Sequence, residues 1–434
     1  MKAYIRTLGC EKNTVDSECA EALFIKNGCS MTSDPNEADF LMVITCGFIL
    51  DAKTQSIEAI FDLISEKRED QKLIVAGCLS QRYSKELSKE IPEADYFLGV
   101  DDYEKLETII KNKSIEKLLT SPCSKTFVEL PREIRRGYTA CIKISEGCNN
   151  VCAYCAIPFM RGRFRSRDEG SILKEAIALA DAGVKELNII AQDVTAYGKD
   201  KGEKDGLEKL LRKLCRIDGI EWIRLLYCYE DEITDGLIKC IKEEPKICKY
   251  IDIPIQHCND KILKSMNRKS TGSSIKATVK KLRDNIPGMV IRTTLITGLP
   301  GEKQAEFKEL YNFVKETEFD RLGCFAYSKE EGTKAASMKQ VRSDVKERRK
   351  DLIMELQREI SLKHNEALIG KTFDVLIDGE EEPGLYTGRT YMDAPDIDNG
   401  VLVSSNKKLE PGDFVKVIIK DAFDYDLTAE AIDR

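Results

Sequence analysis

The chain contains 434 residues, of which 42% are hydrophobic and 33% are charged, and its formal net charge is −7 at pH 7. This length predicts about three domains, and the composition excludes a largely disordered chain. The acidic balance argues weakly against a protein that coats nucleic acid. The longest apolar run, residues 40–50, is about half of what spans a bilayer, and no basic and apolar leader opens the sequence, so we expect neither membrane insertion nor secretion.

The first part of the chain, residues 1–113, alternates between short apolar strands and amphipathic helices. Strands separated by helices predict a parallel sheet with right-handed crossovers, and in such sheets reactive groups gather beyond the carboxyl ends of the strands. We therefore expect an N-terminal α/β domain here. Its expected strands are residues 3–7, 38–45, 72–76 and 96–100, and its expected helices are residues 15–27, 54–67 and 101–111.

The middle of the chain, residues 138–343, repeats the strand–helix pattern six times after a proline-containing linker at residues 114–137. Six such repeats favour a complete or partial barrel of the TIM type, in which ligands bind at the carboxyl ends of the strands. The expected strands are residues 140–144, 186–190, 222–226, 250–254, 290–296 and 321–325.

The last part of the chain has a different character. Residues 344–370 form one long charged helix, which we expect Gly370 to close as its C-cap. Residues 371–434 contain short strands separated by turns, a pattern that predicts a small antiparallel β-barrel. The expected strands there are residues 373–377, 400–404 and 414–419, with turns at Pro383-Gly384 and Pro411-Gly412.

Sixteen cysteines in a chain of this length do not form the dense pattern of a small secreted disulfide scaffold. They fit a reducing cytoplasm with some cysteines held as metal thiolates. The strongest signal is a single loop with Cys148, Cys152 and Cys155, just after the first expected strand of the middle domain. Three thiolates on a cubane cluster leave its fourth iron open to a ligand that is not protein. The same spacing also fits a zinc site in which Cys141 or a distant cysteine is the fourth ligand.

Three further cysteines, Cys10, Cys46 and Cys78, share one position in the predicted fold. Each falls within about three residues of the end of an expected parallel strand, where the strands meet at one edge of the sheet. Each also adjoins a glycine, which lets the backbone approach a bulky inorganic group. The three are either ligands of a second cubane cluster with an open iron or unrelated buried thiols. The remaining ten cysteines are interpreted as packing residues.

An aromatic residue, Tyr154, precedes the last cysteine of the loop, and with this spacing the loop resembles the radical SAM (S-adenosylmethionine) superfamily. Residues 8–18, 45–49 and 77–79 resemble the N-terminal domain of the methylthiotransferases of that superfamily, and residues 388–389 and 393–398 resemble a TRAM domain. The resemblance implies two 4Fe-4S clusters, with SAM bound to the open iron of the first, and no catalytic residues beyond the cluster ligands. The implied ligands are Cys148, Cys152 and Cys155 for the first cluster and Cys10, Cys46 and Cys78 for the second.

Several residues of the middle domain are candidates for contacts with SAM. A loop at residues 298–302 follows an expected strand and is similar to the family's later glycine-rich loop. Gln192, Asp193, Gln256 and His257 end their strands on the face where a barrel ligand lies. Ordinary turns and satisfied polar side chains at strand ends are the alternative interpretation. The expected cofactor-binding set is Tyr154, Gln192, Gln256, Gly298, Pro300, Gly301 and Glu302.

The methylthiotransferases have two large branches. One modifies an adenosine in tRNA, and the other modifies the β-carbon of an aspartate in the small-subunit ribosomal protein at the decoding centre. Several stretches look like the second branch, although two residues beside the expected ligands depart from its usual pattern. The similar stretches are residues 143–148, 192–198, 252–257 and 327–333, and the departures are Glu11 in place of Pro and Ile44 in place of Asn.

The charge of the last domain is independent of these motifs. Residues 371–434 carry seven Lys and Arg against fifteen Asp and Glu, and such an acidic barrel attracts a basic ribosomal protein and repels tRNA. A merely solvated acidic face is the other interpretation. We therefore expect methylthiolation of the ribosomal protein. The alternatives are tRNA methylthiolation and a non-catalytic iron–sulfur or zinc adaptor that binds ribosomes.

The resemblance also implies the chemistry. A hydrogen on an aspartate β-carbon is not activated enough for acid–base catalysis, so a cofactor-borne radical is expected. In the implied scheme the first cluster reduces SAM to a 5′-deoxyadenosyl radical that takes the hydrogen, and the second cluster delivers the methylthio group. The expected partners are the ribosomal protein, free or in the subunit, and an electron donor such as flavodoxin or ferredoxin.

A basic cluster in the linker and four arginines after the cysteine loop are further candidates. They are expected to bind a carboxylate or phosphate, or to be surface charges or structural ion pairs. Those closest to the loop also favour the reduced, more negative state of its cluster. The residues are Arg132, Arg135, Arg136, Arg161, Arg163, Arg165 and Arg167.

Overall fold

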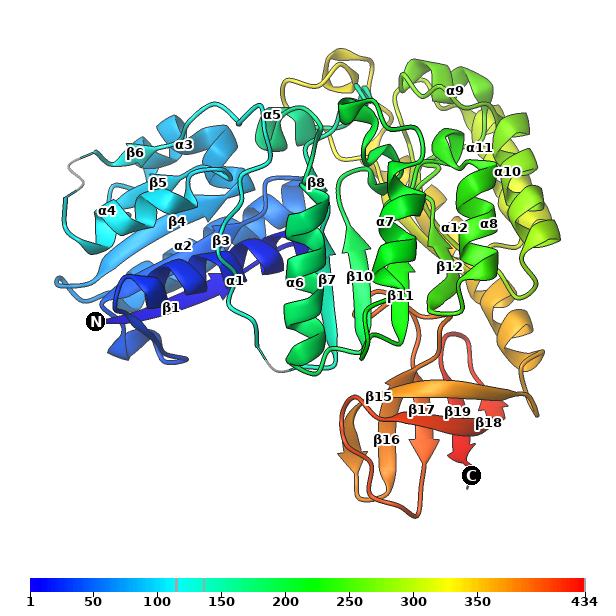
Figure 1. Ribbon diagram of the computed structural model, residues 1–434. Coiled ribbons are helices and arrows are strands. Elements are labelled where there is room, and N and C mark those ends of the chain that lie inside the picture. Colours follow the sequence, from blue (N-terminus) through cyan, green and yellow to red (C-terminus); the bar gives the residue numbers. More distant parts are fainter. Residues whose placement is uncertain (114–115, 136, 433–434) are drawn as a thin grey trace.

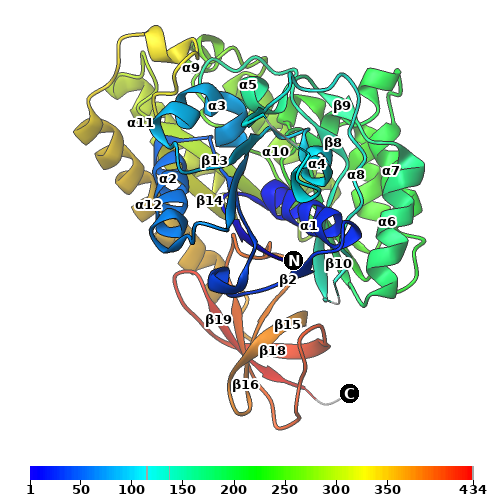
Figure 2. The same cartoon turned by 90° about the vertical axis from the view of Figure 1, so that its left-hand side faces the viewer.

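The computed structural model describes residues 1–113, 116–135 and 137–432, which form three folded parts in chain order (Figure 1). An N-terminal and a central α/β part lie side by side, and a C-terminal β-barrel lies below the central part in both views (Figures 1 and 2). The expected α/β class with a small terminal barrel is confirmed. No helix in the described ranges is long and apolar enough to cross a membrane.

The N-terminal part is built on a six-stranded parallel sheet with the strand order β2-β1-β3-β4-β5-β6. Apolar side chains on one face pack against α1 and α4, and those on the other face pack against α2 and α3. The strands are β1 (Lys2–Thr7), β2 (Ser30–Met31), β3 (Phe40–Thr45), β4 (Lys72–Gly77), β5 (Tyr96–Leu98) and β6 (Leu118–Leu119). The helices are α1 (Glu11–Lys26), α2 (Leu50–Glu66), α3 (Cys78–Glu90) and α4 (Leu106–Ile110).

Helix α3 is absent from the sequence-based expectation. It begins directly at Cys78, without a loop after β4, and it is mostly polar, with Leu79 and Leu87 buried against the sheet. Its backbone is also kinked at Tyr83, where φ is −131°. Because so few of its residues are apolar, the helical pattern that a sequence offers as a signal is weak in this segment.

The central part is a six-stranded parallel sheet with the sequential order β7-β10-β11-β12-β13-β14, open between its first and last strands. The expected partial barrel is therefore confirmed. The strands are β7 (Thr139–Lys143), β10 (Glu186–Ile190), β11 (Trp222–Leu225), β12 (Ile247–Asp252), β13 (Val290–Thr297) and β14 (Arg321–Ala326). The outer helices are α6 (Glu169–Asp181), α7 (Gly206–Leu214), α8 (Asp235–Glu243), α10 (Gly272–Asn285), α11 (Gln304–Thr317) and α12 (Ser343–Glu366), with α9 (Asp260–Ser265) above β12.

The C-terminal part is a closed barrel with the order β15-β16-β17-β19-β18. Four of its pairings are antiparallel as expected, whereas β17 and β19 pair in parallel. The expectation that Gly370 caps α12 is wrong, because the helix ends at Glu366 and Gly370 already donates a hydrogen bond to Ile419 of β18. The strands are β15 (Thr372–Glu382), β16 (Leu385–Arg389), β17 (Val401–Ser404), β18 (Phe414–Ala422) and β19 (Leu427–Ala431).

The concave face of the central sheet is filled from two sides. Helix α1 of the N-terminal part contributes Val15 and Cys19, and the segment 389–398 of the C-terminal part contributes Met392 and Ala394. Buried ion pairs fix this segment: Arg389 to Glu186, Arg321 to Asp393, and Arg292 to Asp398, at 2.7, 2.7 and 3.2 Å. Both neighbouring parts are therefore docked into the central part.

Candidate active site

Cys10, Cys46 and Cys78 lie at the carboxyl ends of β1, β3 and β4, which are adjacent strands of the N-terminal sheet. Glycines make the convergence possible. Gly9 has φ +95°, and a Cβ there would stand 2.9 Å from Cys46 Cβ and 3.3 Å from its Sγ. A Cβ on Gly47 would stand 3.1 Å from the carbonyl oxygen of Cys78. Only glycine lets the three loops come this close.

These three thiols also interact electrostatically. The pKa of Cys78 is raised to about 12, chiefly by burial, with the Arg161 guanidinium opposing the rise and the thiols of Cys10 and Cys46 adding to it. Arg161 Nε donates a hydrogen bond to Cys78 Sγ at 3.2 Å. The site thus holds three thiols close together, with a buried cation against the innermost one.

The loop with Cys148, Cys152 and Cys155 runs from β8 (Ser145–Glu146) to α5 (Ile157–Arg161). Gly147 starts it with φ +77°, where a Cβ would stand 2.2 Å from the carbonyl oxygen of Arg163. The loop is anchored by backbone hydrogen bonds from Ala153 to Met266 and from Ala335 to Ala153, both 2.8 Å. Its three thiols are therefore presented by a backbone that is fixed at several points.

The two thiol sets supply the sulfur donors that iron–sulfur clusters bind. All sixteen cysteines are free. The pKa of Cys155 is raised to about 12, chiefly by burial, and its neighbours Cys152 and Cys148 contribute to the rise. Within the described ranges no three His, Cys, Asp or Glu side chains are close enough to hold one ion. A cubane cluster binds each thiolate at a different iron. Cys141, the fourth ligand considered for zinc, faces Glu11 and Arg132.

Two expected glutamines lie at the carboxyl ends of β10 and β12. Gln192 Nε2 donates to Glu146 Oε1 at 2.6 Å, and its buried Oε1 has no hydrogen-bond partner among the described residues. Gln256 adopts φ +67°, a strained backbone for a residue with a side chain, and bridges Thr294 and Ile296 of β13. Tyr154 lies beside Cys152, and burial raises its pKa well above the usual value.

The glycine-rich loop with Gly298, Pro300 and Gly301 follows β13 and is held from within by Glu302. The Glu302 carboxylate accepts hydrogen bonds from the Gly298 backbone N–H at 2.9 Å and from Arg349 of α12 at 2.6 Å. His257 Nε2 lies 3.6 Å from the same carboxylate. Glu302 is thus fully engaged in shaping the loop, while a Cβ on Gly301 would meet nothing within 4 Å.

Two further polar groups lie beside the cysteine loop. Asp193 accepts a hydrogen bond from the Asn150 side chain at 2.8 Å, which ties β10 to the loop. Arg268, absent from the sequence-based expectation, is buried against Glu230 at 2.7 Å and stacks 4.5 Å from the centre of the Tyr229 ring. Burial raises the pKa of Tyr154 and of Cys155, and the positive charge of Arg268 opposes that rise. Arg268 belongs to no recognisable motif, so only the fold brings it to the loop.

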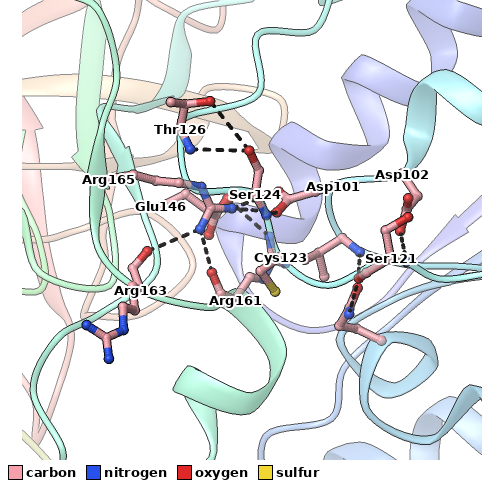
Figure 3. A network of polar contacts seen from close by, with 12 residues as sticks. Asp101, Asp102, Ser121, Cys123, Ser124, Thr126, Glu146, Arg161, Arg163 and Arg165 are labelled. Atoms are coloured by element: carbon pink, nitrogen blue, oxygen red, sulfur yellow. Dashed lines mark hydrogen bonds and ion pairs between the residues drawn. The ribbon is translucent and has the colours of Figure 1, made fainter.

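The candidate arginines are mostly structural. Arg132 pairs with Glu18 and Glu175, Arg135 with Glu21, and Arg167 with Glu129 and Glu175. Arg165 donates two 2.8 Å hydrogen bonds to the carboxylate of Asp101 in the N-terminal part (Figure 3). The same carboxylate accepts a hydrogen bond from the backbone N–H of Ser124 in the linker. Arg163 is exposed, and Arg136 lies outside the described residues.

Arg161 makes different contacts from the other arginines near the loop. It follows Cys155 by six positions in the sequence, yet its guanidinium contacts Cys78 of the other thiol set. The adjacent Asp16, Lys143 and Glu146 complete a buried group of charges that lies between the two sets. Although burial would raise the pKa of Glu146, Lys143 and Arg161 hold it below the usual range.

Three family models match the chain, one for each folded part. Residues 2–99 match an uncharacterized protein family, UPF0004, residues 142–314 match the Radical SAM superfamily, and residues 369–432 match the TRAM domain. Among solved structures, the chain is similar in fold to the radical S-adenosylmethionine methyltransferase TsrM from Kitasatospora setae. That match has a TM-score of 0.59 at 12% identity and covers 89% of this chain and 80% of that one.

Curated relatives match over nearly the full length. The chain is 46% identical to the ribosomal protein uS12 methylthiotransferase RimO of a Thermoanaerobacter species, over 98% of this chain and 99% of the relative. It is 47% identical to the protein of that name from Geotalea uraniireducens, over 99% of this chain and 98% of the relative. It is 48% identical to the one from Caldanaerobacter subterraneus, over 98% of this chain and 99% of the relative. The chain therefore belongs to the RimO family of radical SAM methylthiotransferases, the ribosomal-protein branch that its motifs resemble.

Proposed function

We propose that this protein adds a methylthio group to the β-carbon of an aspartate in uS12, the small-subunit ribosomal protein of the decoding centre. Its relatives at 46–48% identity are named for modification of uS12. The observation that supports the chemistry is the presence of two separate sets of three free cysteines, one in the N-terminal part and one in the central part, with Arg161 hydrogen-bonded to Cys78 of the first set.

We assign one 4Fe-4S cluster to Cys148, Cys152 and Cys155, and an auxiliary 4Fe-4S cluster to Cys10, Cys46 and Cys78. When bound, these clusters and SAM supply radical chemistry that removes an unactivated hydrogen and a source of sulfur for the new C–S bond. The chain itself supplies the three thiolates of each site and the glycines that bring them together.

We assign further residues to the binding of SAM because they lie near the cysteine loop or the glycine-rich loop. Gln192 has a free buried amide oxygen that can accept a hydrogen bond from the SAM amino group. Gly298, Pro300 and Gly301 form a loop with open space beside Gly301, and Glu302 acts by holding that loop rather than by touching SAM. Gln256 and Tyr154 border the same face, and Arg268 adds a buried cation near the loop.

The partners follow from the charge of the chain and from its chemistry. The hairpin tip of β15 and β16 exposes Glu380, Glu381 and Glu382, which favours a basic protein over a polyphosphate. Asp378, Asp393 and Asp398 of the same acidic domain are instead used in internal ion pairs. We propose a small electron donor such as flavodoxin or ferredoxin, and the reducing cytoplasm as the compartment, where free thiols persist.

The proposal is tested by mass spectrometry after anaerobic reconstitution with iron, sulfide, SAM and reductant, in a mixture of unmodified uS12 and tRNA. We expect a methylthio mass increment on one aspartate of uS12 and none on tRNA. An increment on adenosine would move the protein to the tRNA branch. A SAM that stays intact in the presence of reductant would instead favour a non-catalytic adaptor.

Cysteine variants separate the two roles in the same assay. Cys148→Ser should abolish formation of 5′-deoxyadenosine, because the SAM-binding iron is lost. Cys78→Ser should still cleave SAM but transfer no methylthio group. Cys29→Ser, a buried cysteine away from both sets, is the matched control and should behave as the unmodified protein.

A further inference from the structure

Arg161 is the residue of the central part that reaches the auxiliary thiols. It lies at the end of α5, its side chain is 3% exposed, and its three nitrogens all act as donors. Nε donates to Cys78 Sγ at 3.2 Å, Nη1 to Asp16 Oδ2 at 2.7 Å, and Nη2 to Asn13 Oδ1 at 2.7 Å. Every one of these partners belongs to the N-terminal part.

The acceptors of Arg161 are themselves tied to both thiol sets. Asn13 and Asp16 lie in the first turns of α1, directly after Cys10, and Asn13 Nδ2 donates to the carbonyl oxygens of Leu8 and Thr45, next to Cys10 and Cys46. On the other side, Glu146 lies two residues before Cys148 and within 3.4 Å of Arg161. A single guanidinium thus contacts the surroundings of both sites.

We propose that Arg161 is a positioning residue that hydrogen-bonds the Cys78 thiolate and thereby raises the reduction potential of the auxiliary cluster alone. The inference rests on the proposed function, since it requires a cluster on Cys10, Cys46 and Cys78. Reduction adds negative charge to a cluster, and a buried N–H donor with a full positive charge stabilises that charge. The guanidinium bonds to no thiol of the Cys148 loop, so that cluster receives no such bond from it.

The neighbouring arginines show why this role falls to one residue. Arg165 and Arg167 are buried but are directed to Asp101 and to Glu129 and Glu175. Arg163 is exposed and has no ion pair among the described residues. It comes from the same segment as Arg161 and is therefore a matched control.

The experiment compares the reconstituted full-length protein with its Arg161→Met, Arg161→Lys and Arg163→Met variants. Iron and sulfide are counted first, and the midpoint potentials of both clusters are then followed by electron paramagnetic resonance during a redox titration. Addition of SAM perturbs one of the two signals and so identifies the radical SAM cluster. Two clusters in the unmodified protein are the premise, and finding only one would overturn the proposed function itself.

We expect Arg161→Met to shift the auxiliary potential to a more negative value and to leave the radical SAM potential in place. Arg161→Lys, which keeps the charge but loses the Nε donor, should shift it less, and Arg163→Met should shift neither. An unchanged auxiliary potential in Arg161→Met, or equal shifts of both clusters, would overturn the inference.

Asp16→Asn distinguishes contact with sulfur from a general loosening of the docked parts. This variant breaks the ion pair between the two parts but leaves the Arg161 donor at Cys78. Because it removes a buried negative charge, the auxiliary potential should move in the positive direction. A negative shift like that of Arg161→Met would mean that docking alone sets the potential, and the proposed role of the hydrogen bond would be wrong.

Discussion

At the scale of single residues, glycines determine how closely the loops with Cys10, Cys46 and Cys78 approach one another. Gly9 and Gly77 have φ values of +95° and +93°, which side chains adopt only with strain, and both face backbone or cysteine atoms at short range. The pairing of each cysteine with a glycine is visible in the sequence. The close approach of one loop to the next is not, because it depends on which strands are neighbours in the sheet.

Gly9→Ala is therefore expected to lose the auxiliary cluster. Its Cβ would stand 2.9 Å from Cys46 Cβ and push that ligand away, so the reconstituted protein should contain roughly half of the normal iron. Gly28→Ala is the control, since Gly28 has φ +86° but nothing within 4 Å of a Cβ. It should cost about 1 kcal/mol of stability and keep all of the iron. Equal iron loss in both variants would contradict the steric explanation.

At the scale of elements, α12 supports the glycine-rich loop. Arg349 of this helix and Glu302 of the loop form an ion pair, and their side chains are 5% and 0% exposed. The Glu302 carboxylate in turn accepts a hydrogen bond from the Gly298 backbone and so fixes the loop. The long helix was predicted from its charged periodic sequence. Its contact with the loop was not, because residues 47 positions apart meet only through the packing of α12 on β13 and β14.

Arg349→Met should destabilise the protein by about 3–5 kcal/mol, because it leaves the Glu302 carboxylate buried without its cation. The loss is measured as the change in the denaturant midpoint of the metal-free chain. Adding Glu302→Gln to this variant should recover part of it. Arg358→Met on the exposed side of the same helix should cost less than about 1 kcal/mol, and a similar loss in both single variants would argue against the buried pair.

Elements with strong periodicity were predicted from the sequence to within a few residues, including β10 at 186–190 and the strands β1, β3 and β4 that precede Cys10, Cys46 and Cys78. Those with weak or broken periodicity, α3 and strands β16 and β19, were absent from the prediction. Arg268 and the direction of the Arg161 side chain also follow from tertiary contacts alone. Both cysteine sets were predicted from the sequence, because Cys148, Cys152 and Cys155 lie close together in the chain. The other three cysteines each follow an expected strand.

At the scale of the whole molecule, buried ion pairs stabilise the concave interior, or lumen, of the central sheet. Glu186 is fully buried between Arg224 and Arg389, at 2.9 and 2.7 Å, and Arg389 comes from the C-terminal barrel. Burial alone would raise the pKa of Glu186, but the two guanidinium groups hold it below its ordinary value of 4.5. The carboxylate therefore contributes stability above about pH 4.5 and loses it as the pH falls through the lowered pKa.

Glu186→Gln should accordingly be much less stable than the unmodified chain at neutral pH, by about 3–5 kcal/mol, because the buried Arg224 loses its carboxylate partner and Arg389 keeps only Asp378. Below about pH 4.5 the difference should shrink, since the unmodified chain also loses its carboxylate there. Thermal midpoints of the metal-free chain between pH 3 and pH 7 check this, with the exposed pair variant Glu243→Gln as control. A gap that stays constant over this range would contradict the lowered pKa.

The segment 389–398 has a consequence for how the chain can be divided. In sequence the C-terminal barrel is a separable module, with its own family model beginning at residue 369. In three dimensions its loop supplies counter-charges to Arg292 and Arg321 inside the neighbouring sheet. A chain cut at residue 369 would leave Arg321 buried without its partner Asp393, while Arg292 would lose Asp398 and keep only Asp252. We therefore expect the central part to depend on the last domain for its stability.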